Sequence, residues 1–318
     1  MDSTAARTEP AQAPASARNH ASMHFLMLLA TVCWAANIVA GKKALLGFGP
    51  LALAQLRALG AALVFLLAFR LLAFRAGHER PALPSDRRQW RLMVGLGLSG
   101  VTLNQLFFID GLARTTVAHT GLIVSLGPVM VLFLSCLLRM EALTALKMTG
   151  MLVSCAGVAV LTMGHSSVTS GAHWQGDLIV LASSAVFACY TIMVKEVSGR
   201  YDALTLNTLV FGLGALLLAP AGGPALLGVR WSALSAQAWW SLAYMILFGS
   251  VVPYLIYAFA LTELAASRVA AFSYLQPVIA TALGIWLLAE RLTSSAVAGG
   301  TLILLGVYLT ERETGSRD

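Results

Sequence analysis

Ten long apolar stretches, separated by short polar connections, follow one another along the chain. A helix that crosses a lipid bilayer needs about 17–25 mostly apolar residues, because its backbone polar groups must be satisfied internally in hydrocarbon. The seventh stretch meets Pro220, which is expected to end it near Ala219. The ten stretches are predicted to be membrane-spanning helices, at Met23–Gly41, Leu51–Phe74, Leu92–Asp110, Val117–Leu138, Ala145–Met163, Asp177–Val194, Leu204–Ala219, Trp239–Leu261, Val269–Ala289 and Ser295–Thr310.

The composition agrees with a membrane protein and excludes two other classes. Hydrophobic residues make up 58% and charged residues 11% of the chain, against roughly 45–50% and 25% in an ordinary soluble domain. The mean hydropathy of +0.79 requires more apolar burial than one globular core provides. A disulfide-rich secreted scaffold is excluded because the four cysteines fall inside apolar stretches, at Cys33, Cys136, Cys155 and Cys189.

The distribution of positive charge predicts the orientation. Of the 21 Lys and Arg residues, 15 fall in tails and alternate connections on one side, 5 fall on the other side, and Arg57 lies within a stretch. Because positive loops favour the cytoplasm, both termini are predicted to be cytoplasmic. Residues 1–22 are expected to form a disordered tail and residues 312–318 a short C-terminal tail. Cleavage of a signal peptide near Ala35 is the alternative, and it would leave nine spans.

The chain contains an internal repeat. Shifts of 149 residues relate the fourth and fifth stretches to the ninth and tenth, and the third to the eighth. A shift of 153 relates the first stretch to the sixth. Each repeat holds five crossings, an odd number, so the second copy must insert upside down. The matched pairs include Pro128 and Pro277, Glu141 and Glu290, Gly150 and Gly299, Gly157 and Gly306, Trp34 and Phe187, Asn37 and Tyr190, and Lys42 and Lys195.

The residues around the matched prolines and glutamates resemble a known family. The segments Pro128…Glu141-Ala142-Leu143-Thr144…Gly150 and Pro277…Glu290-Arg291-Leu292-Thr293…Gly299 are similar to the EamA repeat of the drug/metabolite transporter superfamily. The resemblance covers about residues 24–311. It implies an all-α, ten-helix protein made of two inverted five-helix repeats, residues 23–164 and 175–311, with a central cavity built from both. It also implies export or permeation of small metabolites, amino acids or related compounds.

Small and polar stripes predict which helix faces lie inside the bundle, because membrane helices associate through small residues and hydrogen bonds. Buried amides are costly in hydrocarbon unless they find a partner or a wet cavity. For each residue the alternative is a helix-to-helix hydrogen bond or an aromatic core contact. The candidate substrate-cavity residues are Trp34, Asn37, Asn104, Ser125, Tyr190, Tyr257, Ser273, Tyr274 and Gln276.

Four further residues are singled out by their chemistry. Pro128 and Pro277 should kink their helices and expose a carbonyl within the membrane, for gating or for packing alone. Arg57 lies well within a span, where an Arg at the helix centre costs about 2.5–3.5 kcal/mol. It could snorkel to the headgroups, clamp a carboxylate or partner a neighbouring helix. His119 could relay protons or serve as a polar helix-end residue.

These patterns predict a secondary transporter rather than an enzyme. The sequence Gly95-Leu-Gly-Leu-Ser-Gly100 spells the dinucleotide fingerprint, but it lies inside an apolar stretch rather than in a βαβ unit. We find no zinc-protease motif and no Walker motif, and we expect no cofactor and no metal. The expected partners are a small-molecule substrate and the bilayer of a bacterial plasma membrane, without nucleic acid, and a homodimer stays open. The alternative is a non-transporting sensor or lipid-translocating protein of the same architecture.

Overall fold

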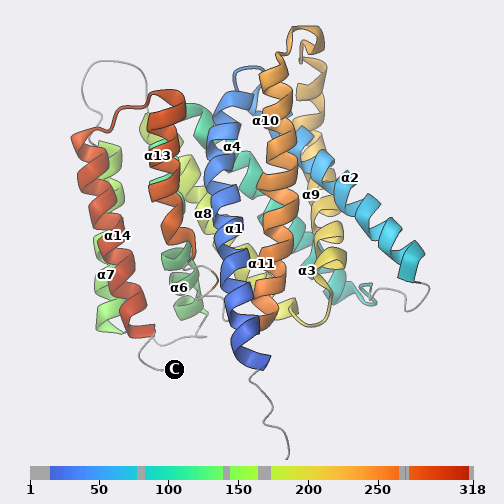
Figure 1. Ribbon diagram of the computed structural model, residues 1–318, viewed down its shortest axis with the longest axis horizontal. Helices are drawn as coiled ribbons and strands as arrows, with labels where there is room; N and C mark the ends of the chain where they lie inside the picture. The colour runs from blue at the N-terminus through green and yellow to red at the C-terminus, as the bar shows by residue number, and fades with distance from the viewer. Residues whose placement is uncertain are drawn as a thin grey trace, which may run out of the picture.

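The computed structural model describes residues 15–76, 83–138, 144–163, 173–264, 269 and 272–314. These residues form helices joined by short connections (Figure 1), and no extended strand is found among them. The first half contains α1 (Ala15–Ala44), α2 (Pro50–Ala76), α3 (Arg87–Gly97), η1 (Leu98–Leu103), α4 (Asn104–Arg114), α5 (Val117–Val124), α6 (Gly127–Leu137) and α7 (Ala145–Met163). The second half contains α8 (His173–Val197), α9 (Ala203–Leu227), η2 (Trp231–Ala233), α10 (Ala236–Ile246), η3 (Leu247–Val251), α11 (Val252–Glu263), η4 (Phe272–Leu275), α13 (Gln276–Leu288) and α14 (Ser294–Thr314).

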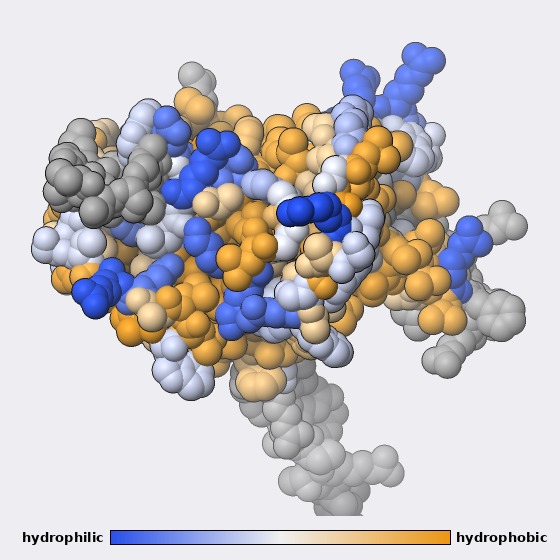
Figure 2. Space-filling model, turned by 90° about the horizontal axis from the view of Figure 1, so that it is seen from above, coloured by the Kyte–Doolittle hydropathy of each residue, from blue (hydrophilic) through white to orange (hydrophobic). Residues whose placement is uncertain are grey.

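Seven helical segments within the described residues are long and apolar enough to cross a membrane, and three apolar helices are shorter. All ten coincide with predicted stretches. Hydrophobic side chains lie along the edges of the bundle in Figure 2, and hydrophilic ones gather across the end seen there. The long segments are Ser22–Ala44, Pro50–Leu71, Arg87–Arg114, Val117–Leu137, Trp174–Val197, Ala203–Leu227 and Ala236–Glu263, and the shorter helices are Ala145–Val160, Gln276–Leu288 and Ser294–Gly306.

Two helix ends extend furthest beyond the prediction. The seventh stretch was expected to end near Ala219, but α9 continues through Pro220 and Pro224 to Leu227. Proline weakens a helix by removing one backbone hydrogen bond, yet packing can outweigh that loss. Gly222 packs directly on the side chain of Gln55 in α2, so contacts between α2 and α9 support the extra turns. The first helix also begins earlier than expected, at Ala15.

The two matched prolines lie in the first turn of a helix, where the missing N–H is not needed. α5 ends at Val124 and α6 begins at Gly127, so Pro128 follows a break in the fourth segment. In the ninth segment, the 3₁₀ turn η4 precedes α13, whose first turn holds Pro277. The predicted kinked helix is therefore an interrupted helix in both halves, and the interruptions fall at equivalent positions of the repeat.

Two π-helical segments also occur at equivalent positions. η1 begins at Leu98 and η3 begins at Leu247, a difference of 149 residues. A π-helix carries an extra residue per turn and leaves backbone groups available to side chains, and it often occurs at functional sites. The third and eighth segments are therefore irregular at equivalent positions of the repeat.

Each half contains the same lysine contact. Lys42 Nζ donates to the carbonyl oxygens of Leu112 at 2.7 Å and Thr115 at 2.5 Å, at the C-terminal end of α4. Lys195 Nζ donates to Leu261 at 2.8 Å and Leu264 at 3.0 Å, at the C-terminal end of α11. The lysines differ by 153 residues and their acceptors by 149, which are the two shifts derived from the sequence. A cation suits a helix C-terminus because the last carbonyls there are unpaired.

Glycine contacts join the two halves in the same symmetric way. A methyl group at Gly100 would overlap the ring of Tyr190, and one at Gly249 would overlap the amide of Asn37. These two contacts are related by the same shifts as the lysine contacts, which supports the alignment of the first helix with the sixth. On one side of the bundle α7 lies along α14 (Figure 1), where Gly157 and Gly306 allow close approach of the backbones.

Candidate substrate cavity

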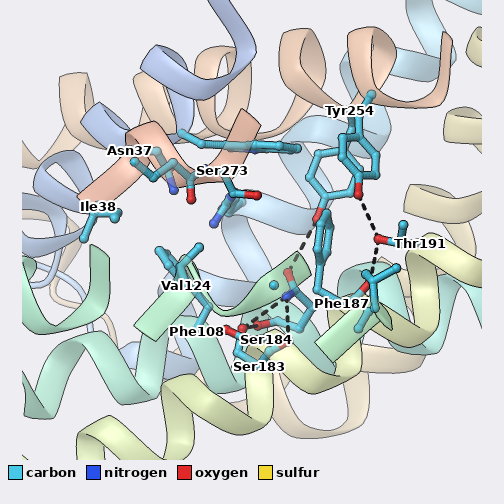
Figure 3. Close-up of a pocket in the computed structure, with 18 residues that line it drawn as sticks. Asn37, Ile38, Phe108, Val124, Ser183, Ser184, Phe187, Thr191, Tyr254 and Ser273 are labelled. Atoms are coloured by element: carbon cyan, nitrogen blue, oxygen red, sulfur yellow. Dashed lines mark hydrogen bonds between the residues drawn. The ribbon is translucent and has the colours of Figure 1, made fainter. Parts of the chain in front are cut away.

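A central cavity lies between the two halves of the molecule. It encloses about 780 Å³, open space at its mouth included, and it is bordered by α1, α2, α4, α5, α6, α8, α11, η4 and α13. The side chains labelled in Figure 3 surround a common space and come from both halves. The lining residues are Trp34, Asn37, Ile38, Arg57, Asn104, Phe108, Val124, Gly127, Val131, Ser183, Ser184, Phe187, Ala188, Thr191, Tyr254, Tyr257, Ser273 and Gln276.

Most of the candidate cavity residues lie on this lining, together with Arg57. Those that do are Trp34, Asn37, Asn104, Tyr257, Ser273 and Gln276. Ser125 does not: it is buried at the end of α5 and donates to the carbonyl of Leu122 at 2.6 Å. Tyr190 is also off the lining and fully buried behind it, against Gly100. The side chain of Tyr274 lies outside the described part of the structure.

Four aromatic rings form one wall of the cavity. Trp34 meets Phe187 at 5.9 Å, Tyr254 at 6.0 Å and Tyr257 at 5.4 Å between ring centroids. Phe187 also packs on Tyr254 and Tyr257. These edge-to-face and tilted arrangements favour rigid packing of the rings. The wall therefore offers a preformed apolar surface.

Hydrogen bonds fix several of the polar lining residues. Asn104 Nδ2 donates to the hydroxyl of Ser183 at 3.1 Å, and the hydroxyl of Tyr254 donates to the carbonyl of Gly100 at 2.9 Å. Thr191 Oγ1 and the Tyr257 hydroxyl are 2.9 Å apart. Figure 3 shows the bonds at Ser183 and Thr191 as dashed lines. Each bond holds a lining side chain in one orientation.

Arg57 is the charged residue on the described lining. Its side chain is 4% exposed. Its Nε donates to Ser250 Oγ at 2.9 Å and its Nη2 to the carbonyl of Gly249 at 2.8 Å, and the guanidinium lies over the ring of Phe108. The ion pairs formed by the described residues do not include it. It is thus held between helices by neutral groups and does not snorkel.

Two buried amide oxygens on the lining lack a partner among the described residues. They belong to Asn37 and Gln276, each 3% exposed. A buried acceptor without a hydrogen bond costs about 1–3 kcal/mol, so such atoms need an explanation such as water or a ligand.

His119 lies away from the cavity, in a separate buried cluster. Its Nδ1 is 3.0 Å from Asp177 Oδ2, and the Thr115 hydroxyl donates to Asp177 Oδ1. Asp177 is fully buried. Val117 and Ala118 directly precede His119 at the start of α5, and their backbone N–H groups donate to the Glu290 carboxylate. Glu290 thus caps the start of α5, whereas Glu141 lies outside the described residues.

Sequence reasoning missed several lining residues. Ser183, Phe187 and Thr191 recur every fourth residue on α8, a spacing that indicates one helix face. Tyr254 lies next to Pro253, three residues before Tyr257, on the same face of α11. Asp177 was assigned to a helix start, and no local pattern linked it to His119, which is 58 residues earlier.

Comparison with known proteins was made for the sequence and for the fold. The profile of the EamA-like transporter family matches residues 21–163 and 174–312. An uncharacterized transporter of Archaeoglobus fulgidus is 28% identical over 90% of this chain and 96% of its own length. A probable terminal-alkyne amino-acid exporter of Streptantibioticus cattleyicolor is 26% identical over 92% of this chain and 94% of its own length. A crystal structure with 17% identity covers 94% of this chain and 99% of its own, with a TM-score of 0.62, and shows the same fold.

Proposed function

Because the chain belongs to the EamA-like transporter family, we propose that it is a secondary transporter of small metabolites that works by alternating access. The observation that carries this proposal is the central cavity lined by residues of both repeats. Binding sites between inverted halves are typical of secondary transporters, since the halves can exchange conformations around them.

The proposal requires that all ten helical segments cross the membrane, with both termini in the cytoplasm. Seven segments are long enough by themselves. In the ninth segment, η4 adds length to the short helix α13. The count of Lys and Arg supports the orientation. The two repeats then cross in opposite senses.

Access would alternate by movement of the interrupted segments. At the end that holds Lys42, α5 packs on α13, where Gly121 lies against Ala280. In the proposed orientation this is the outer end. The Glu290 contacts with Val117 and Ala118 and the buried His119–Asp177 pair add to the closure. We therefore assign the closed outer state to this structure, and His119 holds the closure.

The substrate is proposed to be a small amphipathic metabolite. The aromatic wall suits an apolar group, and the amides and hydroxyls suit a polar one. The name of the Streptantibioticus relative supports amino acids as the class. Pro128 and Pro277 mark the hinges, and the substrate path follows Trp34, Asn37, Asn104, Tyr257, Ser273 and Gln276, with the side chains of Ser125 and Tyr190 beside it.

Counterflow in proteoliposomes tests the proposal. Vesicles that contain the purified protein are preloaded with one unlabelled amino acid or other metabolite, and entry of the labelled solute is followed. We expect transient accumulation for at least one solute of the panel, without ATP. Absence of accumulation for every solute, with protein shown to be folded and inserted, would contradict a transporter and favour the sensor. Movement of labelled lipid between leaflets by the same vesicles would favour lipid translocation.

A further inference from the structure

The buried guanidinium of Arg57 is the feature of the cavity that the fold leaves unexplained. A cation at this depth in a span normally pairs with an acid or lines a water-filled pathway. Here its two hydrogen bonds go to the neutral groups of Gly249 and Ser250, and the described residues supply no carboxylate within ion-pair distance. A guanidinium has five N–H donors in a planar fork. Two are used in the bonds to Ser250 and Gly249, and because Arg57 lines the cavity, the other donors can serve a ligand there.

The second half of the molecule shows that the architecture does not require this charge. Gly60 of α2 packs on Ile246, and Gly214 of α9 packs on Gly97. Ile246 and Gly97 are 149 residues apart and equivalent in the repeat, so Gly60 corresponds to Gly214. The position of Arg57 then corresponds to Phe211.

The polar partner of Arg57 is replaced as well. Ser250 corresponds, at the shift of 149, to Val101. Phe211 is fully buried, with its ring 4.9 Å from that of Tyr254, so an apolar ring occupies the position equivalent to Arg57. The same helix crossing is thus built once with a charged and once with an uncharged side chain. A structural role alone does not account for Arg57.

The unpaired oxygens of Asn37 and Gln276 lie on the same lining as Arg57. Asn37 Oδ1 and Arg57 Nη2 both lie against Gly249, which places an unpaired acceptor near the guanidinium. An acceptor that a cation does not satisfy can receive a hydrogen bond from a ligand ammonium group. The rings of Trp34 and Tyr257 beside them add an aromatic face that favours cations.

From this arrangement we propose that the cavity binds a zwitterionic substrate, with its carboxylate on the guanidinium of Arg57 and its ammonium group toward the oxygens of Asn37 and Gln276. This inference rests on the proposed transport function and names the chemical group that the site recognises. Arg57 is the residue that selects acids, since a planar guanidinium matches the two oxygens of a carboxylate. The aromatic wall takes the remainder of the molecule.

Four compounds with the same isobutyl group separate the two charges of the ligand. L-Leucine carries both, L-leucinamide and isopentylamine lack the carboxylate, and 4-methylpentanoate lacks the ammonium group. The corresponding forms of L-phenylalanine and L-serine extend the panel. Affinity is read from the ligand-induced rise in the melting temperature of the full-length protein in detergent. We expect at least one free amino acid to bind about tenfold or more tightly than its amide and amine.

Three variants assign that preference to the cavity. Arg57→Gln should abolish the preference for the acid, and Arg57→Lys should keep part of it, because the charge remains without the planar fork. Asn37→Asp is nearly isosteric, keeps Arg57 and places a carboxylate beside it. It should weaken binding of 4-methylpentanoate and strengthen binding of isopentylamine, even if Arg57→Gln fails to fold. Arg70→Gln, at an exposed position of the same helix, is the matched control and should change neither.

Three results would each overturn the inference. They are equal affinity for acid and amide, absence of binding by any acid of the panel, and an unchanged preference in both Arg57→Gln and Asn37→Asp. Counterflow separates this failure from failure of the transport proposal. Transport of a cationic solute such as choline, unaffected by Arg57→Gln, would leave a transporter whose substrate is not an acid. If the protein prefers acids in detergent but shows no counterflow of any solute, the carboxylate site is supported and the transport proposal is contradicted.

Discussion

Single residues contribute differently to stability and transport, and the contributions of Lys42 and Lys195 to stability are the simplest to test. Lys42→Met and Lys195→Met each remove a cation that bonds two terminal carbonyls of a helix. We expect each change to lower the free energy of unfolding by about 1–2 kcal/mol. Denaturation in mixed micelles measures the loss. Lys43→Met is the neighbouring control, and a loss as large as that of Lys42→Met would show that the helix-end contact is not the cause.

At the same scale, the lining amide of Asn37 should matter more for transport than a buried amide elsewhere. Asn37→Ala removes a cavity group, whereas Gln105→Ala removes an amide that is fully buried off the lining. We expect the first change to lower counterflow about tenfold and the second to have little effect. The amount of protein in the membrane fraction controls for insertion. Equal flux in the two variants would remove Asn37 from the substrate path.

The elements most relevant to mechanism are the interrupted fourth and ninth segments. Pro277→Ala restores a backbone N–H in the first turn of α13 and removes the ring, which would clash with the carbonyl four residues earlier in a continuous helix. A continuous helix would stiffen the segment. We therefore expect a several-fold lower turnover with little change in substrate affinity. The ratio of kcat to KM effects in counterflow distinguishes this outcome from a weakened binding site, which would raise KM alone.

Helices were easier to predict than their interruptions. Apolar length alone located the ten segments, because hydrocarbon requires such runs. The helix is interrupted at residues 125–126, before Pro128, because the proline already belongs to the first turn of the next helix. The π-helical segments η1 and η3 and the continuation of α9 past Pro220 depend on contacts with other helices. The polar helix faces that line the cavity could be predicted from the sequence. The pairing of His119 with Asp177 could not, because it depends on the assembled fold.

For the whole molecule, the proposed topology makes a prediction about sidedness. In a cysteine-free background, Ser170→Cys lies in the connection between α7 and α8 and His78→Cys in that between α2 and α3. With both termini inside, an impermeant maleimide should label Ser170→Cys in intact cells and His78→Cys only after permeabilisation. The same labelling at both sites in intact cells would contradict five crossings per repeat.

The paired lysine contacts and the paired glycine contacts stabilise different parts of the assembly. Lys42 and Lys195 each tie together helices of their own half, whereas Gly100 and Gly249 receive side chains from the opposite half. A polypeptide severed between α7 and α8 would therefore keep both internal ties within its fragments. The fragments would have to reassociate through their glycine-lined surfaces. Expressing the two halves from separate genes in one cell should therefore allow the intact transporter to assemble.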